Sequence, residues 1–289
     1  MKFIDQLYEI CKTHGYTLQD VYKDIERAAR ISYKSEDKIT EDSAEKMVQR
    51  LIKMKHYSPL EFGTIYLKIE QITCCNIIMK ANAKGCFAKP WLHRNEAIEN
   101  ENGRNVHYWY ITTNYRFIVE NGLEDLLQYM CDPTEHHQRR TTVKFITNRA
   151  VSHELVRHRS MSFMQESQRY VAYDKDKFGN ELTFIKPAWK QPELGEDTNE
   201  TVLMNLLFSH IEDTYMKLRA LGLTPQQART VLPNATKTEL YMCGFDKDWE
   251  HFFSLRDVPT VDPQMYDLVH PLHEDYEKTI ESRRETENG

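Results

Sequence analysis

Apolar residues recur at helical spacing near the start of the chain. The first set, which predicts helices over residues 1–34, is Ile4, Leu7, Tyr8 and Cys11. Residues 42–45 are typical of a helix start. The apolar stripe that follows them consists of Met47, Leu51 and Met54. The first third of the chain is therefore expected to be mainly helical.

The C-terminal third shows the same helical pattern. A stripe over residues 200–220 comprises Leu203, Leu206, Leu207, Ile211 and Met216. Gly222 and Pro225 predict a break after it. A last helix is expected after Asp262-Pro263, and the charged tail over residues 281–289 is expected to fray.

Two segments alternate between apolar and polar residues as strands do. They are Gly63–Ile69 and Thr142–Thr147. The second leads into Ser152–Val156, for which we predict a short helix followed by a turn. Helices that flank a small, mostly antiparallel sheet indicate the α+β class.

Composition narrows the functions that the chain can have. Its 289 residues are 40% hydrophobic and 28% charged, enough for a large buried core. The sequence shows no run of the ~20 apolar residues that a membrane helix needs, and no apolar signal core follows Met1. The net charge of −6 argues against a protein that tracks nucleic-acid phosphates. We expect a cytoplasmic protein without a membrane or nucleic-acid partner.

The cysteines do not form a recognisable metal or disulfide pattern. They are Cys11, Cys74, Cys75, Cys86, Cys131 and Cys243, with no Cys-x-x-Cys pair among them. Free thiols in a reducing compartment are the preferred interpretation. The alternative is a zinc site that combines His93 with one or more of Cys74, Cys75 and Cys86, but its spacing is unlike a zinc knuckle. We therefore expect no metal.

The segment from Arg157 to Tyr170 concentrates donors for an anionic ligand. It contains Arg157-His158-Arg159, then Ser167, Arg169 and Tyr170. Guanidinium groups bind planar oxyanions bidentately, and hydroxyls add phosphate contacts. Successive helical residues turn by about 100°, so the Arg-His-Arg triplet either lies at a helix end or serves several ligands. The segment suits a phosphorylated planar anion, although a solvated basic surface is the simpler alternative.

Arg-His-Arg followed after seven residues by Ser resembles the signature of the flavin-dependent thymidylate synthases, the ThyX family. Further segments resemble the family in the same order. They are Ala28–Tyr33, His56–Glu61, Ala228–Pro233 and Trp249–Arg256. The cysteine setting Pro-Cys-Gln of the folate-only synthases is absent from the sequence, which agrees with a flavin as hydride carrier.

The resemblance implies a single catalytic domain over residues 1–289 that makes dTMP from dUMP. It implies FAD as cofactor, with methylenetetrahydrofolate and NADPH as co-substrates. It also implies a homotetramer, in which the catalytic residue Arg256 reaches the uracil bound to a neighbouring subunit. The implied dUMP-binding residues are Glu154, Arg157, Gln165, Ser167, Gln168, Arg169, Arg229 and Arg256. The implied FAD-binding residues are Ser32, His56, Ser58, Arg157, His158, Arg159 and His251. A nucleophilic Ser167 and buried structural histidines at 158 and 251 are the alternatives.

The chain departs from compact members of the family in two ways. Roughly seventy residues, an insert at about 70–140, separate Lys68 from Arg140. Within it we predict a helix near 123–131 and aromatic packing against the core rather than a folate platform, through Trp91, Tyr108, Trp109, Tyr110 and Tyr115. Individual residues also differ. Glu154 and Phe62 replace a Gln and a His. Gln165 replaces an acid, with Glu166 as the candidate substitute one position later, and Phe245 replaces an Asn that often touches FAD.

Two other functions compete with thymidylate synthesis. A catalytically silent nucleotide- or RNA-binding protein could use the same arginines together with stacking aromatics. A flavin-dependent methyltransferase could act on another pyrimidine nucleotide. The ordered family segments favour thymidylate synthesis over both.

Overall fold

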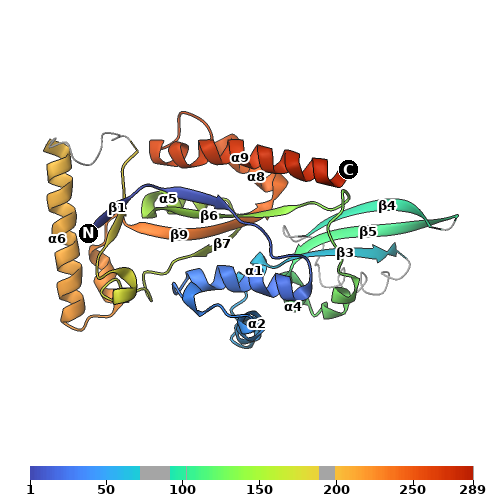
Figure 1. Ribbon diagram of the computed structural model, residues 1–289, viewed down its shortest axis with the longest axis horizontal. Helices are drawn as coiled ribbons and strands as arrows, with labels where there is room; N and C mark the ends of the chain where they lie inside the picture. Colours follow the sequence, from blue (N-terminus) through green and yellow to red (C-terminus); the bar gives the residue numbers. More distant parts are fainter. Residues whose placement is uncertain (72–91, 102, 189–198, 289) are drawn as a thin grey trace.

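A four-stranded antiparallel sheet lies at the centre of the protein (Figure 1). The structure is a computed structural model, and it describes residues 1–71, 92–101, 103–188 and 199–288. The strand order of the sheet is β2-β6-β9-β7. The strands are β2 (Leu7–Ile10), β6 (Arg140–Asn148), β7 (Ser162–Gln165) and β9 (Lys237–Phe245). In the β6–β9 register Arg140 lies opposite Phe245, and Asn148 lies opposite Lys237. Segments almost a hundred residues apart are thereby aligned.

Side-chain alternation along β9 gives the sheet two covered faces. Leu240 and Met242 join a buried cluster with α8 (Asp246–Arg256) and α9 (Pro263–Asn288). Tyr241 and Cys243 point the other way, into a cluster with α1 (Leu18–Ile31). Neighbouring residues of a strand face opposite sides of its sheet, which is why both faces are apolar. Figure 1 shows α8 and α9 on one side and α1 on the other.

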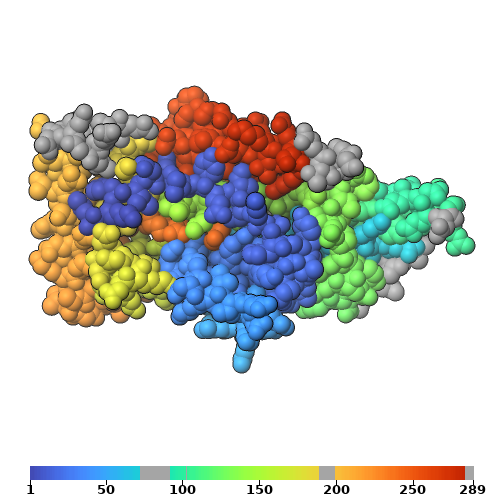
Figure 2. Space-filling model, viewed as in Figure 1, coloured from blue at the N-terminus to red at the C-terminus, as the bar shows by residue number. Residues whose placement is uncertain are grey.

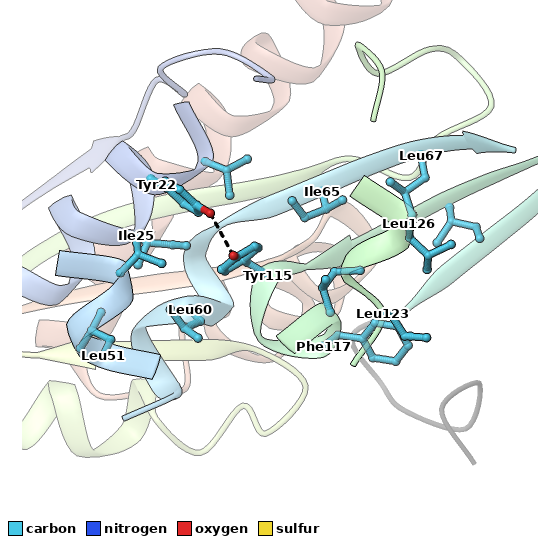
Figure 3. Packing of buried hydrophobic residues seen from close by; sticks show 14 of the residues in the cluster. Tyr22, Ile25, Leu51, Leu60, Ile65, Leu67, Tyr115, Phe117, Leu123 and Leu126 are labelled. Atoms are coloured by element: carbon cyan, nitrogen blue, oxygen red, sulfur yellow. Dashed lines mark hydrogen bonds between the residues drawn. The ribbon is translucent and has the colours of Figure 1, made fainter. Parts of the chain in front are cut away.

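A second antiparallel sheet, in the order β3-β5-β4, joins a strand that precedes the insert to two strands within it. The strands are β3 (Thr64–Glu70), β4 (His93–Glu101) and β5 (Arg104–Asn114), followed by α4 (Tyr115–Asn121) and the 3₁₀ helix η4 (Glu124–Tyr129). Its core also takes in α1, α2 (Ser43–Lys53) and the 3₁₀ helix η2 (Ser58–Phe62). Figure 3 shows this packing, in which the Tyr22 and Tyr115 hydroxyls lie 3.0 Å apart.

A third unit covers the end opposite the β4–β5 hairpin (Figures 1 and 2). Strands β1 (Lys2–Ile4) and β8 (Thr183–Ile185) pair in parallel beside the long helix α6 (Asn199–Ala220). The short helices α7 (Pro225–Ala228) and η6 (Arg229–Val231) follow α6. Two further short 3₁₀ helices of the described residues are η1 (Glu36–Lys38) and η5 (Asp176–Phe178). Helix α6 leaves an apolar row exposed, formed by Leu203, Leu206 and Leu207.

The predicted class is confirmed as a mixture of helices and small, mainly antiparallel sheets, but the described residues form three sheets rather than one. The predicted strands over 63–69 and 142–147, and the helices that follow residues 42, 199 and 262, are confirmed. The prediction of helices was wrong for the first residues of the chain, because β1 and β2 form there and pair with distant strands. The helix near 123–131 is 3₁₀, and α9 remains helical to Asn288 rather than fraying.

The insert's aromatic side chains mostly pack inside, as predicted. Trp109, Tyr110 and Tyr115 are at most 9% exposed, whereas Tyr108 is half-buried. Trp91 lies outside the described residues. Within the described ranges, helices that could cross a membrane are absent.

Candidate functional site

The signature triplet lies where helix α5 (Arg149–Leu155) ends, as its sequence predicted. The Asn148 side chain caps the helix start by accepting a hydrogen bond from Val151 N at 2.8 Å. At the other end, the amide groups of Arg157 and His158 donate to Glu154 O and Leu155 O at 3.2 and 3.3 Å. The chain then turns into β7. A helix end followed by a strand lets the triplet's side chains point to different places.

A compact cluster links this helix end to α8. We call it the Arg256 cluster, consisting of Glu154, His158 and Arg256. Arg256 Nη1 donates to Glu154 Oε2 at 2.7 Å, and Arg256 Nε donates to His158 Nε2 at 3.1 Å. The Arg256 and Glu154 side chains keep 17% and 30% of their surface exposed. The cluster therefore joins two predicted site residues to the signature and stays accessible to a ligand.

His158 is neutral in this cluster. Its Nε2 accepts a hydrogen bond, so the ring proton is assigned to Nδ1. Burial, followed by the electrostatic influence of Arg256 and of nearby His251, lowers the pKa of His158 to about 4. The ring packs edge-on against Phe252 at 4.9 Å between centroids. His251 is exposed on α8, so its interpretation as a buried histidine was wrong.

The two arginines of the signature triplet, Arg157 and Arg159, lie in different surroundings. Arg159 lines a cavity of about 200 Å³ together with Arg140, Ser160, Ser162 and Phe245. Arg157 is not among the lining residues, and its charge contributes to lowering the pKa of His153, after burial and Arg149. This division agrees with the expectation that the triplet cannot face one pocket.

Sequence reasoning missed a basic row along α5. Arg149 and His153 lie one turn apart on α5, and Arg157 follows four residues later in the turn beyond the helix end, where its charge acts on His153. Arg149 Nη2 lies 3.1 Å from His153 Nε2. Burial and the nearby charge of Arg229 lower the pKa of Arg149. The structure thus brings the predicted Arg229 close to this row, and the four-residue spacing was the signal that could have revealed it.

Ser32 and Ser167 lie side by side, although 135 residues separate them in the sequence. The Ser167 amide donates to Ser32 O at 3.2 Å, and Ser32 Oγ donates to Gln165 O at 3.3 Å. Arg169 Nε donates to Gln226 Oε1 at 3.2 Å. Gln168 Nε2 is buried and has no hydrogen-bond partner in the described part of the chain. An unpartnered buried donor beside these residues is suited to a ligand contact.

Gln165 and Glu166 both point into the protein. The Gln165 amide donates to Ser152 Oγ at 2.9 Å and to Thr238 Oγ1 at 3.1 Å. Glu166 is 3% exposed and accepts hydrogen bonds from Tyr173 OH at 2.9 Å and Lys237 Nζ at 3.0 Å. Glu166 is thus engaged by internal partners and does not present a free carboxylate in place of Gln165.

Glu166 belongs to a larger set of charges that we call the buried ion network. Its members are Lys34, Lys144, Glu166, Lys237 and Glu239. Glu239, which is 5% exposed, lies 2.8 Å from Lys34 Nζ and 2.9 Å from Lys144 Nζ, and also pairs with Lys237. Burial alone would raise the pKa of Glu239, but Lys237 and Lys34 outweigh it and hold that pKa well below its usual range.

The last two residues of the predicted FAD-binding set are His56 and Ser58. His56 and Ser58 are exposed where η2 begins, and η2 packs against β7. In the described ranges neither side chain makes a hydrogen bond to the signature.

The zinc alternative gains no support from the residues that the structure describes, where no group of three metal-ligating side chains occurs. Cys74, Cys75 and Cys86 lie outside those residues. Cys11, Cys131 and Cys243 are free thiols, as expected. The His93 ring lies 6.1 Å from the Phe245 ring.

Comparison with known proteins gives a family match over most of the chain. The family model described as "Thymidylate synthase complementing protein" matches residues 15–81 and 78–280. A "Probable flavin-dependent thymidylate synthase" of Paramecium bursaria Chlorella virus 1 is 27% identical over 146 residues, covering 49% of this chain and 68% of that protein. The "Flavin-dependent thymidylate synthase" of Pyrococcus furiosus is 30% identical over 159 residues, covering 52% and 62%.

Other matches are shorter or more distant. The flavin-dependent thymidylate synthase of Geobacter sulfurreducens is 34% identical over 110 residues, covering 38% of this chain and 44% of that protein. The chain thus spans less than two thirds of the length of the Pyrococcus furiosus and Geobacter sulfurreducens proteins. A solved structure described as the UMP/dUMP methylase PolB from Streptomyces cacaoi is 16% identical, with a TM-score of 0.44, covering 96% of this chain and 93% of that one.

Proposed function

This chain belongs to the thymidylate synthase complementing protein family, and from that membership we propose that it is a flavin-dependent thymidylate synthase acting as one catalytic domain. The proposed reaction transfers the methylene carbon of methylenetetrahydrofolate to C5 of dUMP and releases tetrahydrofolate. C5 loses its proton, and a hydride completes the methyl group of dTMP. The hydride derives from NADPH, which is oxidised to NADP⁺. FAD supplies the hydride-carrying chemistry when bound.

The Arg256 cluster is the observation that carries this proposal. C5 of uracil is a weak nucleophile, and negative charge develops on the ring oxygens as C5 attacks. A guanidinium held by Glu154 and His158 can stabilise that charge without reorganising during the reaction. Neutral His158 adds no competing positive charge and orients Arg256 Nε. We propose Arg256 as the catalytic residue.

The basic row and the Ser167 turn suit the nucleotide. Arg157 and Arg229 offer guanidinium groups for the dUMP phosphate, and Arg149 adds a third. Ser167, Gln168 and Arg169 provide further donors beside them, while Glu154 and Gln165 support this surface through Arg256 and Ser152. Ser167 is proposed as a binding residue, because within the described residues its hydroxyl accepts from the Arg169 amide and does not contact a general base.

The residues beside Arg159 fit the flavin cofactor. The cavity combines the Phe245 ring, which suits a planar aromatic system, with the Arg140 and Arg159 guanidinium groups, which suit phosphate. We propose that Ser32, His56, Ser58, His158 and His251 complete the FAD-binding surface with Arg157 and Arg159. Glu154 differs from the amide of compact relatives, and here its carboxylate fixes Arg256 instead of donating to uracil.

We further propose a cytoplasmic homotetramer without nucleic-acid or membrane partners. The exposed Leu203, Leu206 and Leu207 on α6 support self-association, since contiguous exposed apolar residues often mark interfaces. Glu154, His158 and Arg256 of one chain lie together, so we propose that they enter a neighbouring subunit's site as a unit. The free thiols Cys11, Cys131 and Cys243 suit a reducing compartment.

An anaerobic assay of the purified protein tests this function. FAD, NADPH, methylenetetrahydrofolate and dUMP are supplied, dTMP is measured, and dCMP replaces dUMP in a parallel reaction. dTMP that requires both flavin and NADPH is the expected result. Product only from dCMP would transfer the assignment to another pyrimidine. Absence of product and of flavin binding would contradict it and favour a nucleotide-binding protein.

A further inference from the structure

Arg140 carries a buried positive charge at the base of the insert. It is the first residue of β6 and only 6% exposed. Its Nη1 donates to the carbonyl oxygen of Glu61 at 3.0 Å and to Thr64 Oγ1 at 3.1 Å. These partners hold the guanidinium where the insert leaves and rejoins the core. Both are neutral, so neither balances its charge.

The nearby carboxylates are engaged elsewhere. Glu61 Oε1 accepts from Arg116 Nη1 at 2.6 Å, and Asp248 Oδ2 accepts the Phe245 amide at 3.0 Å. Within the described ranges, Arg140 forms no ion pair with a carboxylate. A buried guanidinium has five N–H donors and is costly to keep without a counter-charge. Such a group is suited to a ligand that brings the negative charge.

Arg140 lines two cavities at once. The first is the cavity of about 200 Å³, whose lining also includes Arg159 and the carboxylates Glu61 and Asp248. The second measures about 460 Å³ and includes Lys12, Tyr16 and Arg283 in its lining. No Asp or Glu of the described chain lines the larger cavity. A phosphate held by Arg140 could therefore carry substituents into either space.

Phe245 connects Arg140 to the cofactor. The Arg140 guanidinium carbon lies 5.7 Å from the centre of the Phe245 ring, and the two residues are paired across β6 and β9. Phe245 stands where compact relatives often have an Asn that touches FAD, and a phenyl ring offers no conventional hydrogen-bond donor there. Phe245 instead supports a guanidinium from the neighbouring strand. The lost polar contact and the buried charge thus occur at the same place.

We propose that Arg140 is an additional cofactor-binding residue that contacts a phosphate group of FAD. This inference rests on the proposed function and assigns to Arg140 the polar contact that Phe245 lacks. The insert then has a defined role, because the junction where it rejoins the core delivers Arg140 to the cavity beside Arg159. The ligand group is a phosphate rather than the flavin ring, so the contribution of Arg140 depends on the phosphates being present.

Flavin titrations with and without phosphate test the assignment. Binding of FAD and of riboflavin is followed by flavin fluorescence for wild type, Arg140→Gln, Arg140→Lys and the control Arg50→Gln. Arg50 is exposed on α2, outside the lining of both cavities. Arg140→Gln is expected to weaken FAD binding by about 10- to 100-fold, since a charged hydrogen bond is lost. Riboflavin affinity should change by less than about twofold, and Arg140→Lys should recover part of the FAD affinity.

Other results would overturn the assignment. Unchanged FAD affinity in a folded Arg140→Gln variant removes Arg140 from the site, and equal losses for FAD and riboflavin indicate a purely structural role. If the Gln variant does not fold, Thr64→Val removes one hydrogen bond that positions Arg140 and should weaken FAD binding by about fivefold with riboflavin unaffected. Wild-type affinity in Thr64→Val then contradicts the proposal. Wild-type protein that binds neither flavin overturns the proposed function itself, and the Arg140 assignment with it.

Discussion

The buried ion network and the Arg256 cluster are both built from carboxylates and cations near the signature, yet they differ in how their charges are satisfied. In the network, Glu239 lies between three lysine side chains, and Glu166 is held by Lys237 and Tyr173. In the Arg256 cluster, one guanidinium meets one carboxylate and one neutral histidine, and part of each charged side chain remains exposed.

This difference separates a structural role from a ligand-binding role better than the amount of charge does. The network contains more charged groups, but its acids are almost fully covered by partners in the same chain. Buried, internally paired charges fix packing and are strongly destabilising when one partner is removed. The Arg256 cluster instead leaves charge accessible to a substrate. Mutations should therefore affect stability in the first region and turnover in the second.

The largest expected effect is the loss of turnover in Arg256→Ala. The variant removes the guanidinium proposed to stabilise charge on uracil, so dTMP formation should fall by about 10³-fold. The melting temperature should change little, because Arg256 is partly exposed and its Glu154 partner can be solvated. Single-turnover kinetics with calorimetry of the same sample measure both quantities. Normal turnover would remove Arg256 from the catalytic role.

Glu239→Gln should produce the opposite pattern. Losing the central carboxylate leaves Lys34, Lys144 and Lys237 without their common partner, which should lower the free energy of unfolding by about 3 kcal/mol. Urea denaturation measures this loss. Glu250→Gln, on the exposed face of α8, is the matched control and should stay within about 0.5 kcal/mol of wild type. Turnover per folded molecule should be close to wild type, and a large loss of turnover at unchanged stability would contradict the comparison.

The sequence revealed the Arg256 cluster more readily than the network for a physical reason. Arg256 and His158 each belong to a short motif, and such motifs can be recognised one segment at a time. The network arises from strand register, which places Glu239 opposite Ile146 and close to Lys144. Register between distant strands leaves no local pattern in the sequence.

The same limit explains the errors in fold and site. Spacing between Ile4, Leu7 and Tyr8 fits a helix, but pairing of β2 with β6 overrides this local preference. The position of Arg140 opposite Phe245 also depends on pairing between distant strands, so it was not foreseen. The same holds for the sheet formed by β3, β5 and β4. The strand–helix–turn arrangement of the signature was predictable because its signals are local: alternation, a short helix and a helix end.

A smaller effect is expected for Ser167→Ala. Removing the hydroxyl should weaken dUMP binding by about fivefold, the loss of one ordinary hydrogen bond, and leave kcat near wild type. Equilibrium dialysis with dUMP and steady-state kinetics separate the two. Because Ser167 is bonded to Ser32 through its backbone amide, the local turn should survive the change. Unchanged dUMP affinity combined with lost turnover would instead support the nucleophile alternative.

The smallest effect concerns two histidines that share a lowered pKa but occupy different regions. Burial lowers the pKa of His137, in the insert, and that of His158 to about 4 each. His137 contacts Leu67 O, Thr134 and the Cys131 thiol, whereas His158 contacts Arg256. Each unfolded ring has a pKa near 6.5, so the unfolded state gains protons first and stability falls as the pH drops from about 6.5 towards 4.

Replacing either histidine with Gln should therefore reduce the acid-induced loss of stability, by about 1 kcal/mol between pH 7 and pH 5 after allowance for solvent screening. Urea titrations at the two pH values measure this change. FAD affinity at pH 7 should separate the variants: His137→Gln is expected to bind FAD as wild type does, and His158→Gln more weakly, because only the second side chain belongs to the Arg256 cluster. Equal FAD affinities would mean that His158, despite its place in the signature, is as structural as His137.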